Sequence, residues 1–155
     1  MPDRIINFDL TKVYTATDLD VPALGERFRQ DGKEYIFLTG VASTAAGDPV
    51  IFDSAFATTR LAGTLVGEVA IALAATVAST KGWYQIYGTG SANVVATGGV
   101  RVYTHTVTGQ LLATVVTGAL VHGMHTVTGN GNTVTGTLTT VRMAYPFVDR
   151  ASGSY

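Results

Sequence analysis

The three histidines are the residues of this chain whose type and spacing first suggest chemistry. His105 and His125 each open a copy of the pentapeptide HTVTG, and His122 precedes the second copy at a spacing of three. That spacing places two zinc ligands on one face of a helix, but in a strand it points them to opposite faces. The surrounding sequence is typical of strands, so we expect neither a metal site nor a cofactor. Histidines meeting on the threefold axis of an oligomer are the alternative.

Acid–base catalysis is the second chemistry that these histidines could perform. It requires a carboxylate to orient the imidazole, and the sequence has no Asp or Glu between Val94 and Ala144. The motifs GxSxG and HExxH are also missing, which leaves only a triad completed by the distant Asp48 or Asp53. We therefore expect that the protein is not an enzyme.

Threonine pairs and a glycine-rich segment are the other candidate motifs. Two threonines separated by one residue share a face of a strand, as in ladders that bind ice or polysaccharide. The HTVTG copies are twenty residues apart but the next TVTG follows after seven, so no solenoid period is present. We expect ordinary strand residues at Thr106/Thr108, Thr126/Thr128, Thr133/Thr135 and Thr137/Thr139. The segment GTGSANVVATGG lacks the lysine of a phosphate-binding loop and is expected to be a loop between strands.

Composition limits the classes of partner. Hydrophobic residues make up 46% of the 155 residues and charged residues 14%, with a net charge of -1 and no cysteine. A surface with so few charged residues favours packing against other subunits. The sequence has no run of basic residues, which argues against nucleic acid as a binding partner. Leu61–Thr80 is as long as a membrane span, but Glu68 near its centre and two glycines argue against insertion, so no membrane partner is expected.

Short strand-like runs separated by turn signals dominate the chain from Gly25 onward. Asp31 and Gly32 lie between two such runs and predict a tight hairpin, and Pro49 is expected to begin a strand. No stretch predicts an amphipathic helix. The remaining predicted strands are LVGEVAIALA, GWYQIYG, NVVA, VRVYTHTV, QLLATVV, ALVHGMHTV and NTVTGTLTTVRMAY. The pattern predicts a mainly β protein, an antiparallel β-sandwich or barrel with an extended N-terminal arm.

Three phrases between Leu24 and Gly88 carry a resemblance to a known family. They are DGKEY at 31–35, GDPV at 47–50 and GWYQIYG at 82–88, accompanied by Gly25. Together they resemble the capsid decoration, or cement, proteins of tailed bacteriophages. The resemblance implies a small β domain that binds as an oligomer across contacts between major capsid proteins, with an extended terminal arm and no catalytic residue.

The residue pattern, together with the resemblance, sets the expected organisation. We expect an extended arm over 1–24, a β domain over 25–145 with a family-like part (25–90) and Thr-rich strands (91–145), and a C-terminal tail over 146–155. The arm either docks on a neighbour or packs on its own domain. Trp83 is expected in the core.

The expected function is that of a structural virion protein on the exterior of a phage capsid, made in the host cytoplasm. Its expected partners are the major capsid protein and further copies of itself in a homo-oligomer, by analogy a trimer on local threefold positions. The expected capsid or subunit contacts are Ile5, Phe8, Leu10, Tyr14, Tyr84, Tyr87, Tyr145 and Phe147. The alternative is a virion-displayed carbohydrate or host-surface binding module built on the threonine pairs and aromatic side chains.

Overall fold

The computed structural model describes residues 9–95, 101–113, 119–127 and 138–149. These residues form ten strands and no helix, which confirms the predicted mainly β class. The strands are β1 (Arg27–Gln30), β2 (Lys33–Thr39), β3 (Pro49–Phe52), β4 (Thr58–Arg60), β5 (Gly67–Ala72), β6 (Lys81–Val95), β7 (Arg101–Thr104), β8 (Leu111–Leu112), β9 (Leu120–Thr126) and β10 (Leu138–Val148). No helix in this part of the chain is long and apolar enough to cross a membrane.

Six of these strands close into a barrel. The order β6-β8-β7-β9-β10-β5 returns to β6 through the pairing of β5 with β6, while β1 and β2 extend the sheet on one side and β3 and β4 on the other. Neighbours are antiparallel except β6 and β8, which run parallel. Closure removes the exposed edges that an open sheet of this size would carry. The barrel therefore leaves β1 and β4 as the outer strands.

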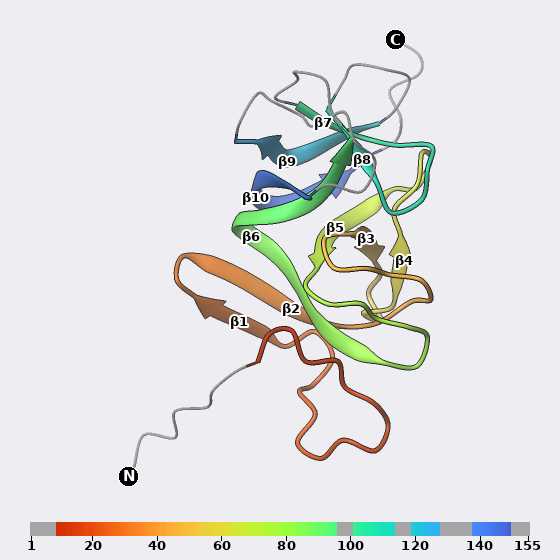
Figure 1. The fold of residues 1–155 in the computed structure, drawn as a ribbon, viewed down its shortest axis with the longest axis vertical. Helices are drawn as coiled ribbons and strands as arrows, with labels where there is room; N and C mark the ends of the chain where they lie inside the picture. Colours follow the sequence, from red (N-terminus) through yellow and green to blue (C-terminus); the bar gives the residue numbers. More distant parts are fainter. Residues whose placement is uncertain (1–8, 96–100, 114–118, 128–137, 150–155) are drawn as a thin grey trace.

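The longest strand, β6, joins the two ends of the molecule (Figure 1). In its first half Gln85 pairs with Tyr35 of β2 and with Ile71 of β5, so both edges are occupied. At Tyr87 the pairing with β2 ends and the pairing with β10 begins. The first half of β6 thus joins the extension of β1 and β2 to β5, and its second half pairs with β10.

Gly88 marks this change of partners. Its φ is 90°, a left-handed conformation that glycine adopts without a steric cost, and a Cβ here would lie 2.7 Å from the carbonyl oxygen of Gly32. The backbone of β6 can therefore touch the tip of the β1–β2 hairpin. GTGSANVVATGG (88–99) is predicted as a loop with only NVVA as a strand, but β6 continues without a break through Gly88 to Val95, because glycine in a strand allows such a close approach.

The core divides into three clusters with different side chains. The barrel encloses aliphatic residues and methionines, among them Val102, Leu111, Val141 and Met143. We call this cluster the aliphatic barrel core. At the opposite end, the aromatic end comprises Tyr35, Phe37 and Trp83 with the partly buried Leu10, Tyr14, Val21, Phe28 and Leu73 packed against them. A third cluster between them includes Ile36, Val50 and Tyr84.

Several local predictions are confirmed. The hairpin turn lies at Asp31 and Gly32, whose φ values of 51° and 73° are those that a tight primed turn requires. Pro49 is the first residue of β3. Trp83 is buried in the aromatic end, with its ring 5.1 Å from that of Phe37.

Two predicted boundaries need correction. β10 continues through Pro146 to Val148, past the predicted end of the β domain. Proline is tolerated there because the pairing of β10 with β9 shifts register between Met143 and Phe147. The strand predicted as VRVYTHTV ends at Thr104, so the first HTVTG lies in a turn rather than in a strand.

The described part of the predicted arm packs on its own domain. The backbone N–H of Tyr14 donates to the carbonyl of Lys81 at 2.8 Å, and the N–H of Lys81 donates back at 2.9 Å. The ring of Tyr14 meets the ring of Phe37 edge-on, with centroids 5.2 Å apart. Of the two alternatives for the arm, residues 9–24 therefore follow the second, because their apolar side chains complete the aromatic end.

Candidate functional site

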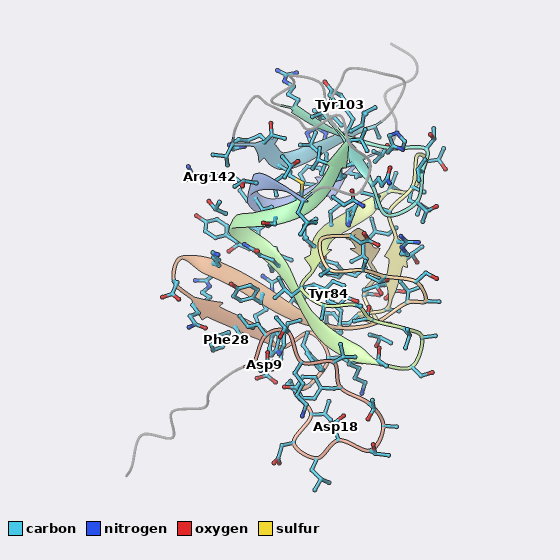
Figure 2. The ribbon with its side chains drawn as sticks, in the orientation of Figure 1. Asp9, Asp18, Phe28, Tyr84, Tyr103 and Arg142 are labelled. Carbon is cyan, nitrogen blue, oxygen red and sulfur yellow. The ribbon has the colours of Figure 1, made fainter. Side chains whose placement is uncertain are left out.

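The predicted contact residues fall into three groups. Ile5 and Phe8 lie outside the described residues. Leu10 and Tyr14 pack into the aromatic end instead of projecting toward a partner. Tyr84 has no exposed surface and its hydroxyl is hydrogen-bonded to Thr76 at 2.8 Å, so its expected role as a contact residue is wrong. It lies at the centre of the molecule (Figure 2).

Tyr87, Tyr145 and Phe147 are exposed, by 39%, 45% and 44% respectively. The rings of Tyr87 and Tyr145 lie 5.3 Å apart, and the ring of Phe147 stacks on His122 at 4.8 Å. We call these three aromatic residues the aromatic strip. Large aromatic side chains held outside a barrel by neighbouring rings are typical of surfaces that another molecule covers.

A bulge in β10 directs Tyr145 toward the outside. Ala144 and Tyr145 are both exposed although they are neighbours in a strand, and Tyr145 has a φ of 50°. The partner strand supplies Gly123, where a Cβ would lie 2.6 Å from the carbonyl oxygen of Ala144. Bulges turn side chains in this way next to binding sites. A positive φ at a tyrosine is a strain that the surrounding contacts must offset.

Glu34 lies beneath the hydroxyl of Tyr145, and sequence reasoning did not select it. Its side chain is only 2% exposed, and its carboxylate accepts hydrogen bonds from Arg27 Nη1 at 3.1 Å, Arg29 Nε at 2.6 Å and Tyr145 Oη at 2.9 Å. Two arginines on β1 and one tyrosine on β10 thus meet on a single buried carboxylate. The alternation Arg-Phe-Arg before a hairpin whose facing strand carries Glu was the available signal, because cross-strand neighbours on one face form such pairs.

The electrostatics keep Glu34 ionised. Burial raises its pKa, but the hydrogen bonds from Tyr145, Arg29 and Arg27 together outweigh burial and leave the pKa below the ordinary value of 4.5. The same contact with Glu34 raises the pKa of the Tyr145 hydroxyl, which therefore stays a donor. Glu34 in turn raises the pKa of Arg29.

The three histidines have different surroundings. His105 Nδ1 accepts the backbone N–H of Val107 at 2.8 Å, so this imidazole closes a local turn. His122 Nε2 lies 3.2 Å from Asp149, a carboxylate beyond the stretch without acidic residues, whereas His125 is exposed on β9. Within the described residues, no three His, Asp or Glu side chains are grouped closely enough to hold a metal ion.

The first HTVTG turn is held by a buried polar cluster. The carbonyl of Gly109 accepts Asn93 Nδ2 at 3.2 Å, and its N–H donates to the carbonyl of Leu61 at 2.8 Å. A Cβ at Gly109 would overlap the guanidinium of Arg60, which is paired with the buried Asp48 at 2.8 Å. The glycine of the motif is therefore required by close packing against this ion pair.

The threonine pairs do not form a ladder in the described residues. Thr106 and Thr108 are exposed but lie in the turn, while Thr126 and Thr139 are buried at 3% and 7% exposure. The other predicted members, Thr128, Thr133, Thr135 and Thr137, lie outside the described residues. The in-strand pairing expected at Thr106/Thr108 is wrong, because the strand ends before it.

Comparison of the chain with protein-family models, with curated proteins and with solved structures finds no significant match.

Proposed function

We propose that this protein is a structural decoration protein that binds the outer surface of a tailed-phage capsid and reinforces contacts between major capsid proteins. The observation that carries the proposal is the aromatic strip of Tyr87, Tyr145 and Phe147 on a thinly charged barrel. Aromatic residues dominate the energy of protein interfaces, and a shell multiplies a modest contact over many copies. The resemblance over Leu24–Gly88 identifies the class of partner.

The elements that carry the resemblance surround this strip. The phrase DGKEY forms the hairpin tip and the start of β2, and GWYQIYG forms the first half of β6 and ends beside Tyr87. Residues 1–8, with Ile5 and Phe8, are the part of the arm that this proposal assigns to the shell or a sister subunit. The protein is proposed to act as a homo-oligomer, with a trimer matching a local threefold position.

Carbohydrate binding is not proposed. That alternative was built on the threonine pairs and the aromatic side chains; its threonine part loses support because Thr126 of β9 and Thr139 of β10 are buried. Thr106 and Thr108 are exposed, but they lie in a turn and not in a strand, so their hydroxyl groups are not part of a ladder.

The test compares variants for binding to shells assembled without this protein. Phe147→Ser and Tyr87→Ser are expected to weaken binding about tenfold or more, the effect of losing an interface aromatic. Val77→Ser is the matched control, because Val77 is 54% exposed but lies outside the strip. The readout is the number of copies that sediment with the shells. Equal binding by all three variants would show that the aromatic strip does not contact the shell.

A further inference from the structure

A charged groove runs between the tip of the β1–β2 hairpin and β10. Its larger part has a volume of about 550 Å³ and is lined by 29–34 together with Tyr87 and Tyr145. A smaller part of about 260 Å³ shares Asp31, Gly32, Lys33 and Tyr87 and continues to Arg142. In Figure 2 Arg142 projects on the side of the molecule where the hairpin tip also lies.

We propose that this groove binds an acidic, extended peptide segment of a partner protein. The proposal goes beyond capsid decoration, because it concerns the chemistry of the ligand and holds for whichever protein supplies it. It rests on the charges along the groove, on the way Glu34 holds Arg29, and on the tyrosine pair at the floor.

Positive charge exceeds negative charge along the groove. Arg29, Lys33 and Arg142 line it against Asp31 and Glu34, and Glu34 is already neutralised by a second arginine, Arg27. In the described part of the chain, neither Lys33 nor Arg142 forms an ion pair with a carboxylate. These two cations are therefore available to a ligand.

Arg29 is oriented for recognition. Its Nε donates to Glu34 at 2.6 Å and its Nη2 to the hydroxyl of Tyr145 at 3.3 Å, while 75% of the side chain is exposed. A guanidinium has five N–H donors in a rigid plane, so the two hydrogen bonds also fix the plane of the remaining donors of Arg29, which lines the groove. Such a preorganised fork suits a carboxylate, which accepts two parallel hydrogen bonds.

The distribution of charge favours an extended ligand. Arg29 lines only the larger part of the groove and Arg142 only the smaller part, with Lys33 common to both. One small anion would leave some of these cations unmatched, whereas a peptide with successive carboxylates matches them along its length. The rings of Tyr87 and Tyr145, 5.3 Å apart and tilted by 34°, offer an apolar surface to the peptide backbone and β-carbons. Nucleic acid is disfavoured because the sequence has no run of basic residues that could follow a phosphate backbone.

The experiment titrates fluorescein-labelled hexaglutamate with the intact chain and follows anisotropy at low salt. We expect saturable binding that Arg142→Glu and Lys33→Glu each weaken at least tenfold. Arg101→Glu is the matched control, because it reverses an exposed charge that does not line the groove. Its affinity is expected to stay within twofold of the unmodified protein. Thermal unfolding of each variant verifies that it is folded.

Three results would overturn the proposal. The first is the absence of saturable binding to hexaglutamate. The second is equal weakening by Arg101→Glu and Arg142→Glu, which would indicate attraction to overall charge alone. The third is binding of fluorescein-labelled oligothymidylate as tight as that of hexaglutamate, which would indicate a phosphate site. No shell is used, so the outcome is independent of whether the protein binds capsids.

Discussion

The aromatic end and the aliphatic barrel core are both buried apolar clusters, but they are built from different side chains. The aromatic end has few, large side chains, and it depends on long-range partners such as Tyr14 from the arm. The barrel core has many smaller side chains, from Ala92 and Val94 to Val148, enclosed by strands that close on themselves. The groove lies where the two regions meet, at Tyr87 of β6, and Tyr87 also belongs to the aromatic strip.

The barrel and the β1–β2 hairpin are held in place in different ways. Barrel closure satisfies the backbone of β5 to β10 without help from exposed side chains. The hairpin of β1 and β2 is fixed by particular contacts, among them the three hydrogen bonds to Glu34. Changes to exposed residues at the junction are therefore expected to affect binding, whereas changes to buried residues, in either core or at the junction, are expected to affect stability.

The largest expected effect comes from Phe37→Ala in the aromatic end. Phe37 is completely buried, so its removal should lower the free energy of unfolding by about 4 kcal/mol, against about 3 kcal/mol for Met143→Ala in the barrel core. Because β6 runs through both regions, both should unfold together. Urea unfolding followed by the fluorescence of Trp83, the single tryptophan, and by circular dichroism should give coincident transitions. Separate transitions would divide the molecule into two folding units.

The second effect concerns the buried charge at the junction. Glu34→Gln should lower stability by about 3 kcal/mol at neutral pH, since the hydrogen bonds from Arg27, Arg29 and Tyr145 lose their buried anionic acceptor. The folded-state pKa of Glu34 lies below 4.5, so its contribution is complete above that pH and is lost as the pH falls below it. Stability measured over an acidic pH series should therefore fall less steeply in the variant. A parallel decline in the two proteins would contradict this assignment.

The smallest of the three effects tests the contact between hairpin and β6. Gly88→Ala should cost about 2 kcal/mol, because a φ of 90° is unfavourable for alanine and its Cβ would lie 2.7 Å from a carbonyl oxygen. Gly32→Ala, which also has a positive φ but no heavy atom within 4 Å of its Cβ, should cost only about 1 kcal/mol. Chemical denaturation of both variants measures the difference. Equal losses of stability in the two variants would mean that the close approach of the Gly32 carbonyl oxygen to Gly88 adds nothing to the effect of the Gly88→Ala substitution.

The parts of the fold that sequence patterns predicted are those with local signals. Asp31 and Gly32 specify their hairpin through backbone conformation, and Pro49 and Trp83 lie where residue type alone places them. The continuation of β6 through Gly88 was not predictable in this way. From the sequence alone, a glycine at this position predicts a turn. The structure shows that it is needed because the backbone of the hairpin approaches closely.

The candidate site was predicted only in part, because its contacts join distant residues. Tyr145 and Glu34 are separated by 111 positions, so no local sequence pattern predicts their hydrogen bond. The choice of Tyr84 as an exposed residue was wrong because β6 is covered on both faces at that point. The choice of Tyr87 agrees with its exposure, since the strand leaves β2 there.

The most direct test of the proposed function is the addition of purified protein to tailed-phage shells that were assembled without it. The account predicts saturable binding to the outer surface at a fixed ratio to the major capsid protein, and shells that withstand a higher temperature before they rupture. Absence of binding, or binding without any gain in heat resistance, would contradict the assignment as a decoration protein.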